Sequence, residues 1–310
     1  MNFNGFWASC LLGLVLPVLG GCQNTPPENK TPEQTCPDLA KAACKKLAEC
    51  EAGLSAYLFP DTASCEAYFA ADCKTQATAS GSKWTGDAIA SCATTVSGVS
   101  CYDYWTAVKP LTADTTLLCS LPAGTVATGG ACGTSSQCQG ALCSTVTAGC
   151  GKCATRGQAG ASCDSVFNCD KGLDCAGTSP RQCTLFLTQN QACNTETDGS
   201  SVHCHPTLAC INGKCVTPAK LNETCRPGKA DCEAWLICSA AGKCEQDLPS
   251  LGQPCNFACK APGYCDMGTK KCVARAAAGA ACGAPNPTVC TTGYDCINGK
   301  CGQYDPNVCK

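Results

Sequence analysis

The cysteine content constrains this chain more than any other feature of its sequence. Thirty-six of the 310 residues are cysteine, a density typical of scaffolds held by disulfides rather than by an apolar core. Leu, Val, Ile and Phe are correspondingly scarce after the N-terminal segment. Disulfides form and persist on the oxidising side of a membrane. We therefore expect an extracytoplasmic protein whose fold depends on bonds between sulfur atoms.

The N-terminus predicts a secretory signal. Residues 6–19 form an apolar run that is too short to span a bilayer as a stable helix but typical of a signal peptide. The run ends in the tetrapeptide LGGC, which closes at Cys22 and resembles the lipobox of bacterial lipoproteins. This resemblance implies that residues 1–21 are a cleaved lipoprotein signal peptide and that the Cys22 sulfur carries a diacylglycerol, with palmitate as a typical fatty acid. The alternative is an ordinary cleaved signal with Cys22 in a disulfide.

The residues after Cys22 predict where the anchor places the chain. Residue 23 is Gln rather than Asp, which in Gram-negative lipoproteins implies the outer membrane of the bacterial cell envelope, facing the periplasm or the surface. Residues 22–35 are polar with three prolines, so we expect the lipidated Cys22 to be followed by a flexible tether. Removing Cys10 and acylating Cys22 leaves 36 − 2 = 34 cysteines, an even number that can all pair.

Residues 36–125 have the composition of a small helical domain. The spacing of apolar residues predicts a helix over 36–58, with Pro37 at its first position behind Thr35, and further helices over 60–74 and 85–96, the first of them capped by Asp61. Two cysteine pairs of equal spacing would let two antiparallel helices be stapled at both ends. The eight cysteines of this block can close among themselves as four disulfides: 36, 44, 50, 65, 73, 92, 101 and 119.

Residues 126–310 contain a sixfold repeat. Groups of four cysteines recur at intervals of 27 to 32 residues, which indicates repeated structural units; the groups begin at 132, 163, 193, 225, 255 and 282. Gly or Asn stands three residues before each first cysteine, and these two residues adopt positive φ most readily. Each unit is therefore expected to begin with a tight turn. The nearly constant gap of five residues between the second and third cysteines suggests a strand-like segment.

The hexapeptide CINGKC marks the end of two units, at 210–215 and 296–301. Asn-Gly between short extended segments predicts a β-hairpin with a type I′ turn, which would place Ile opposite Lys and the two cysteines opposite each other. We expect a small disulfide-rich protein: an N-terminal disulfide-stapled helical domain followed by about six short β-hairpin cysteine-rich repeats.

Four cysteines in a unit allow three pairings. We favour first with third and second with fourth, because this crossed pattern locks the hairpin to the strand before it, whereas a bond between third and fourth would only clamp the hairpin. Cys150 and Cys309 stand outside the six groups. They either pair with each other, which would bring the two ends of the array together, or pair locally in a displaced pattern.

The repeat resembles the N-terminal cysteine-rich domain of Dickkopf proteins in its turn residue, its cysteine spacing and the Leu or Tyr near the third cysteine. Copies of this pattern also occur in bacterial cysteine-rich lipoproteins with a helical, eight-cysteine N-terminal block. The resemblance covers about residues 126–301, and more loosely 36–119. It implies extracellular contact between proteins without matching any receptor-binding residue.

The sequence offers few ways to build a catalytic or metal site. Cys150 and Cys153 have C-x-x-C spacing, but Cys153 is the fourth cysteine of the first unit, so we expect a structural role for this motif. The other cysteine spacings are not those of zinc sites. His203 and His205 are the only histidines; with Glu196 or Asp198 they would form a metal site, against the simpler reading of two surface residues. Carboxylate pairs cannot be placed from sequence. We expect no enzyme, no cofactor and no metal, and the thinly spread basic residues indicate no nucleic-acid partner.

The function that remains is a membrane-anchored, non-enzymatic binding or interaction module. Its partner would be a protein or a glycan, and the membrane would be reached through the lipid on Cys22. The long acidic loop between Cys193 and Cys204 is the candidate binding site; its residues are Asn194, Thr195, Glu196, Asp198 and His203. The alternatives are a secreted protease inhibitor, a small hydrolase on the same framework, or a purely structural envelope or adhesion protein.

Overall fold

The computed structural model describes most of the chain from residue 29 to residue 309. The described ranges are 29–107, 118–119, 121–147, 150–164, 168–177, 180–194, 203–227, 231–233, 235–256, 258–283 and 289–309. The predicted signal peptide, the predicted lipidation site Cys22 and most of the predicted tether lie outside these residues. No helix within the described ranges combines the length and the apolar character needed to cross a membrane.

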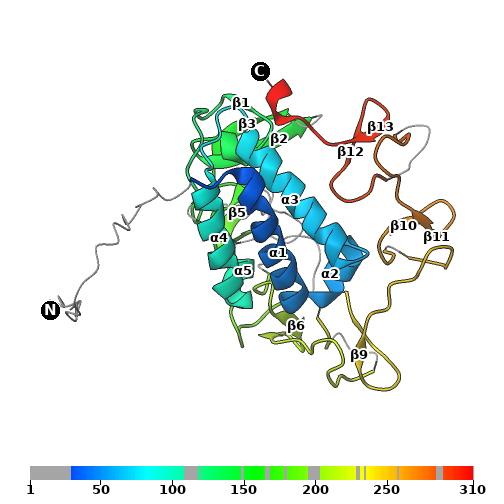
Figure 1. Cartoon of the computed structure of the whole chain (residues 1–310). Helices are drawn as coiled ribbons and strands as arrows, with labels where there is room; N and C mark the ends of the chain where they lie inside the picture. The colour runs from blue at the N-terminus through cyan, green and yellow to red at the C-terminus, as the bar shows by residue number, and fades with distance from the viewer. Residues whose placement is uncertain are drawn as a thin grey trace, which may run out of the picture.

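The first part of the chain is helical, as predicted (Figure 1). Its elements are α1 (Pro32–Cys50), α2 (Ala52–Leu58), α3 (Thr62–Thr78), α4 (Gly86–Gly98) and α5 (Cys101–Ala107). The long helix α1 packs against both α3 and α4. Asp61 caps α3 by accepting a hydrogen bond from the Ser64 backbone amide at 2.7 Å, and Thr85 caps α4 in the same way. The predicted second and third helices are therefore confirmed.

The predicted start of the first helix is wrong. The helix begins at Pro32 rather than Pro37, so residues that we assigned to the tether form its first turn. Thr31 is the N-cap, and its backbone amide donates to Gln34 Oε1 at 2.8 Å in a capping box. This cap secures the first turn, and Pro37 lies inside the helix, where it removes a single backbone donor. Thr35 is buried, unlike a tether residue.

Disulfides and a modest set of apolar side chains share the core of the helical block. Leu39, Leu47, Ile89, Val96 and Tyr104 are buried together with the cysteines of this block. Two disulfides staple α1 to α3 at both ends, as the cysteine spacing predicted. All eight cysteines pair among themselves: Cys36–Cys73, Cys44–Cys65, Cys50–Cys101 and Cys92–Cys119.

The rest of the chain consists of short antiparallel hairpins. The first unit has three strands in the order β1-β3-β2, and each later unit has a two-stranded sheet. A short 3-10 helix, η2 (Ser135–Gln137), lies in the first unit, and another, η4 (Pro306–Val308), lies near the C-terminus. The strands are β1 (Ala131–Cys132), β2 (Ala141–Thr147), β3 (Cys150–Thr155), β4 (Leu173–Ala176), β5 (Gln182–Leu185), β6 (Ala209–Ile211), β7 (Lys214–Val216), β8 (Ile237–Cys238), β9 (Cys244–Glu245), β10 (Gly263–Asp266), β11 (Lys271–Ala274), β12 (Asp295–Ile297) and β13 (Lys300–Gly302).

The turn chemistry of the repeats is confirmed. All six predicted turn residues have positive φ, between 67° and 86°: Gly129, Gly160, Asn190, Asn222, Gly252 and Gly279. In the first CINGKC copy, Asn212 and Gly213 both have positive φ, and Cys210 lies opposite Cys215 in the register. The second copy has the same geometry. The strand-like segment predicted between the second and third cysteines is only partly extended. In unit 2, for example, the chain turns at Gly172 before β4 begins.

The crossed disulfide pattern is confirmed in all six units. First cysteines bond to third cysteines in Cys132–Cys143, Cys163–Cys175, Cys193–Cys210, Cys225–Cys238, Cys255–Cys265 and Cys282–Cys296. Second cysteines bond to fourth cysteines in Cys138–Cys153, Cys169–Cys183, Cys204–Cys215, Cys232–Cys244, Cys259–Cys272 and Cys290–Cys301. The third and fourth cysteines face each other in the hairpin, yet each bonds to a sulfur outside it.

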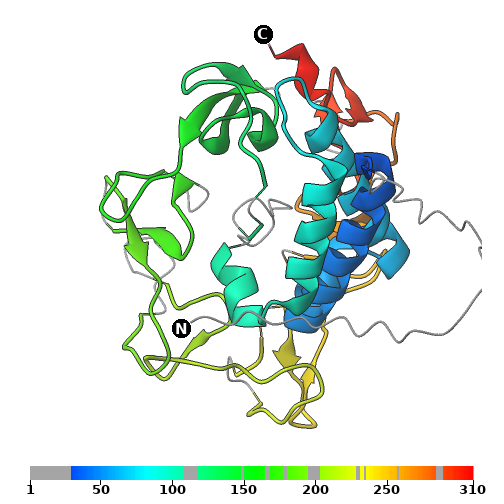
Figure 2. The same ribbon diagram turned by 60° about the vertical axis from the view of Figure 1, so that its left-hand side comes forward.

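The units follow one another around the helices, and the last unit returns beside the first (Figure 2). A disulfide between Cys150 and Cys309 joins these two ends, which confirms one of the two predicted alternatives. Unit 4 contacts the helices through Trp235, whose ring stacks on Tyr57 at 4.2 Å between centroids. The C-terminal segment contacts them through Asn307, whose Oδ1 accepts from the Ser80 amide at 2.7 Å. The array therefore curves around the helical block and contacts it at several points (Figure 2).

Candidate functional site

The predicted binding loop is described only at its two ends. Thr195, Glu196 and Asp198 lie outside the described residues, whereas Asn194 and His203 lie within them. The loop joins the first cysteine of unit 3 to the second, and both of these cysteines are held by disulfides to the hairpin of the same unit. The two ends of the loop are thus fixed covalently.

An ion pair adds a polar anchor at the C-terminal end of this loop. His203 Nδ1 lies 2.7 Å from Asp174 Oδ2, and the His203 backbone amide donates to the same oxygen at 3.1 Å. Asp174 is buried on β4 of unit 2. Burial acts to raise the pKa of Asp174, but hydrogen bonds from His203 bring this pKa below its ordinary value. The hydrogen bond to Asp174 raises the pKa of His203. The pair therefore favours the charged state of both groups.

His205 serves packing between the array and the helices. Its ring is buried and stacks on Tyr102 of α5 with 3.9 Å between centroids. Nε2 lies 2.8 Å from the Thr106 hydroxyl and Nδ1 lies 2.8 Å from the Thr207 hydroxyl. Both ring nitrogens are thus engaged by hydroxyl groups. His203 and His205 are directed to different partners, so the structure does not bring them together as a shared metal site.

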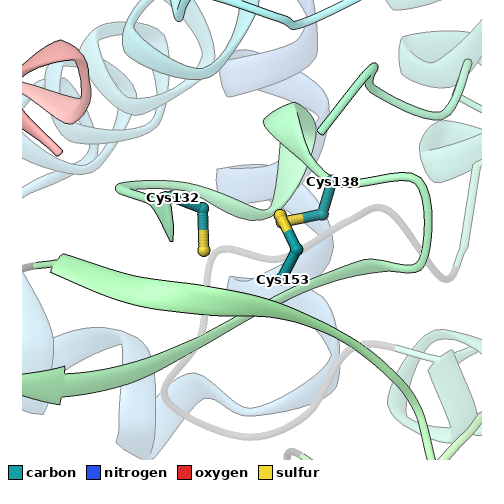
Figure 3. Close-up of side chains that lie close together, drawn as sticks. All are labelled: Cys132, Cys138 and Cys153. Carbon is teal, nitrogen blue, oxygen red and sulfur yellow. A yellow bond between two sulfur atoms is a disulfide. The ribbon is translucent and has the colours of Figure 1, made fainter. Parts of the chain in front are cut away.

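Three sulfur atoms lie close together in each of units 1 to 5, in an arrangement that resembles a metal site. In unit 1, the sulfurs of Cys132, Cys138 and Cys153 lie within 4.8 Å of one another (Figure 3). Metal binding by cysteine requires a thiolate. Here Cys138 is bonded to Cys153 and Cys132 to Cys143, so the clusters result from the crossed disulfides. The C-x-x-C motif is likewise structural, because Cys150 bonds to Cys309.

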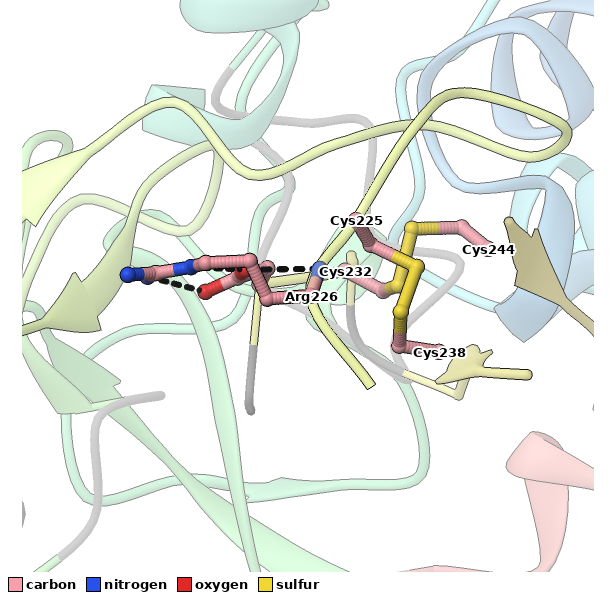
Figure 4. A network of polar contacts seen from close by, with 6 residues as sticks. Cys225, Arg226, Cys232, Cys238 and Cys244 are labelled. Atoms are coloured by element: carbon pink, nitrogen blue, oxygen red, sulfur yellow. Dashed lines mark hydrogen bonds and ion pairs between the residues drawn. A yellow bond between two sulfur atoms is a disulfide. The ribbon is translucent and has the colours of Figure 1, made fainter. Parts of the chain in front are cut away.

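Unit 4 shows how side chains brace the loop between the first and second cysteines. Arg226 follows Cys225, and its guanidinium binds Asp231 through Nε at 2.7 Å and Nη2 at 2.8 Å (Figure 4). The Arg226 backbone amide donates to the same carboxylate at 3.1 Å. The two disulfides of the unit lie beside this pair. The ion pair and the two disulfides thus fix the two ends of the loop between Cys225 and Cys232.

The structure also brings together two carboxyl groups that sequence reasoning missed. Glu51 follows α1 and is buried, and Glu233 belongs to unit 4. Burial, followed by the nearby charge of Glu233, raises the pKa of Glu51 to about 8. Burial also raises the pKa of Glu233. The two residues are far apart in the sequence and neither belongs to a motif, so no sequence signal linked them.

The structure defines a small disulfide-rich protein with helices near the N-terminus and many short antiparallel hairpins. No protein-family model matches the chain, and no solved structure matches it. The chain is 37% identical over 124 residues to cell-cell adhesion glycoprotein 64 of Heterostelium pallidum. This match covers 37% of the chain and 35% of that protein, so the chain spans about a third of its relative. The similarity is compatible with a non-enzymatic interaction or adhesion role at the cell surface.

Proposed function

We propose that this protein is a non-enzymatic adhesion or interaction protein that acts outside the cytoplasm. One observation carries the proposal: all 34 cysteines in the described residues form 17 disulfides, from Cys36–Cys73 in the helical block to Cys290–Cys301 in unit 6, with Cys150–Cys309 closing the array. Because the disulfides already restrict the loops between them, these loops lose little conformational entropy when they bind a partner. The similarity to a cell-cell adhesion glycoprotein supports the same class of function.

In this proposal, a lipid holds the protein at the bacterial outer membrane. Residues 1–21 are removed and Cys22 carries the lipid, as the LGGC tetrapeptide and the resemblance to lipoproteins with Dickkopf-like repeats suggest. The even number of cysteines that remains is compatible with acylation of Cys22. Intact mass of the membrane-extracted protein tests the anchor. A mass that lacks residues 1–21 and includes the acyl chains supports it, and an unmodified Cys22 contradicts it.

The loop from Asn194 to His203 is the proposed contact site for a protein or glycan partner. Its ends are fixed by two disulfides and by the Asp174–His203 ion pair. Its sequence contains Glu196 and Asp198, so it offers acidic side chains to a partner. The disulfides hold the ends of the loop in place whatever its sequence, which makes the loop replaceable without loss of the fold.

The test replaces residues 195–202 with a Gly/Ser segment of equal length. Beads coated with the native protein are expected to cluster or to bind a glycan array, and the variant is expected to lose this binding while keeping all disulfides. A matched variant with residues 284–288 replaced, in the equivalent position of unit 6, is expected to bind normally. Equal binding by both variants discards the loop as the contact site. Native protein that instead inhibits a protease in a panel of assays contradicts the adhesion role.

A further inference from the structure

A cavity of about 540 Å³ lies where the helical block meets units 3 and 4 of the array. The end of α1 and the start of α5 form one side through Glu51 and Tyr102, and the array forms the other side through Leu208, Pro218 and Glu233. Its volume falls in the range of sites that bind small molecules. The Cys50–Cys101 disulfide also contributes to the wall and fixes the two helix ends.

The cavity contains a buried polar atom that lacks a partner. Glu51 is 8% exposed, and its Oε2 has no hydrogen-bond partner among the described residues. Buried polar groups in native proteins are usually hydrogen-bonded, because an unpaired one forfeits its hydration without compensation. Glu51 lines the cavity, and its carboxyl group lacks a full set of hydrogen-bond partners within the described residues, so this group is suited to receive a donor from a ligand. Burial raises the pKa of Glu51 to about 8, so near neutral pH the carboxyl is protonated when no cation is bound and becomes an acceptor for a cation when it ionises.

The charges around the cavity favour a ligand with one positive charge. Once Glu51 has released its proton as a cation binds, Glu51 and Glu233 supply two carboxylates and Lys220 supplies one ammonium group, which leaves a net charge of −1 on these three lining groups. A single cationic group would balance this charge. Lys220 lies close enough to act on the pKa of Glu51, and its positive charge would oppose a divalent metal ion more strongly than a monovalent group.

The remaining lining favours an organic cation over an inorganic one. Tyr102, Leu208 and Pro218 present aromatic and aliphatic surface, which a hydrocarbon chain can cover. An aromatic ring such as that of Tyr102 also attracts a cation near its face. Calcium, by contrast, takes six to eight oxygen ligands. A wall that combines a carboxyl acceptor with apolar surface matches an alkylammonium or a guanidinium group.

We propose that this cavity binds an organic cation, a primary ammonium or guanidinium group, whose N–H donors reach Glu51 while its hydrocarbon part lies against Tyr102 and Leu208. This site is independent of the proposed contact loop, which lies elsewhere in unit 3 and is tested separately. The cation is either a free amine or the side chain of a lysine or arginine in a peptide. Both sources share the chemistry that the cavity recognises.

The test is calorimetric titration of the full chain with n-butylamine, N-acetyl-lysine amide and N-acetyl-arginine amide near neutral pH. We expect saturable 1:1 binding of at least one of these, with a measured heat that depends on the buffer because Glu51 releases its proton. Binding of butylamine identifies free amines as sufficient, and binding of the capped amino acids alone points to a peptide. Calcium chloride is titrated in parallel; tighter 1:1 binding of calcium than of every amine overturns the proposal.

E51Q keeps the size of the side chain but cannot ionise when a cation binds, so it is expected to weaken amine binding at least tenfold. E233Q is the second variant and is expected to weaken binding in the same direction. The matched control is E245Q, because Glu245 is an exposed acid on β9 of unit 4 that does not line the cavity. Unchanged affinity in E51Q, equal losses in E51Q and E245Q, or no amine binding by the native protein overturns the proposal.

Discussion

Cys150 and Cys309 are bonded to each other although 159 positions separate them in the sequence. Every other disulfide in the described residues spans at most 51 positions. This bond joins unit 1 to the C-terminal segment and so closes the array around the helical block. The Tyr304 hydroxyl lies against both sulfur atoms. A chain of small units is thereby converted into a closed ring that packs against the helices (Figure 2).

Opening this ring is expected to loosen the whole array. In the chain-entropy model a closed loop of this length contributes up to ~5 kcal/mol, against ~3 kcal/mol for a loop of 14 residues. The C150S/C309S variant should therefore lose thermal stability and gain amide hydrogen exchange in distant units, including the Trp235 contact on Tyr57. The C282S/C296S variant is the control, because its bond is local to unit 6. Exchange confined to the sites of substitution in both variants would contradict a role for ring closure.

The repeat units could be predicted in detail because their signals are local. A positive φ is accessible mainly to Gly and Asn, so residues such as Gly160 and Asn222 marked the turns. The crossed pairing followed from the position of the hairpin relative to the strand before it. The predicted first helix starts too late because Pro37 also suits a first helical position. The true start is marked in the sequence by the capping box of Thr31 and Gln34.

The arrangement of the units around the helices could not be predicted, because it depends on contacts between distant segments. Trp235 stacks on Tyr57 with a backbone φ of 69°, which is unusual for a bulky residue. His205 inserts beside α5, although in the sequence it seemed equivalent to His203. The meeting of Glu51 with Glu233 depends on the same packing. Single-sequence patterns carry no information on such long-range packing, so the candidate cavity emerged only from the structure.

The hairpin glycines are expected to be sensitive to substitution. Gly213 has φ of 74°, and a Cβ there would meet only one atom, at 4.0 Å, so G213A tests backbone strain without a steric clash. We expect the free energy of unfolding to fall by about 1–2 kcal/mol, because an L-residue with a side chain is disfavoured in this conformation. Chemical denaturation with the disulfides intact measures this change. G98A at the end of α4 has open space and no positive φ, so this variant should be neutral or slightly more stable than the native protein. Equal effects of both variants would contradict the assigned turn type.

The Asp174–His203 pair is expected to be visible in a histidine titration. The chain has two histidines, so an NMR titration resolves each imidazole. The pKa of His203 should lie above its ordinary value of 6.5, because Asp174 holds the proton on the ring. Since the folded pKa is raised, this group stabilises the fold below pH 6.5 and the contribution is lost as the pH rises through the raised pKa.

The D174N variant should return the pKa of His203 toward 6.5 and remove this pH dependence. D164N is the matched control, because Asp164 is an exposed acid of the same unit. The contribution of Asp174 runs the other way: its pKa is lowered from 3.8, so its stabilisation is lost on acidification. The pair should thus be most effective between about pH 4 and the raised pKa of His203. A His203 signal that titrates identically in D174N would show that the ion pair does not form in solution.

Glu51 is expected to make the protein less stable as the pH rises through neutrality. Its pKa is raised from 4.5 to about 8 by burial and by the charge of Glu233. Between these values the unfolded chain gives up a proton that the folded chain retains, so the free energy of unfolding falls with increasing pH. Below pH 4.5 the carboxyl is protonated in both states and has no such effect.

E51Q should therefore melt at a higher temperature than the native protein at pH 8, by a margin equivalent to a few kcal/mol at most, and at about the same temperature at pH 4. E245Q, which changes the charge of an exposed acid, should show no comparable gain. A gain in E51Q that is equal at pH 4 and pH 8 would show that the substitution acts through packing, and that the Glu51 carboxyl is not held protonated in the folded protein.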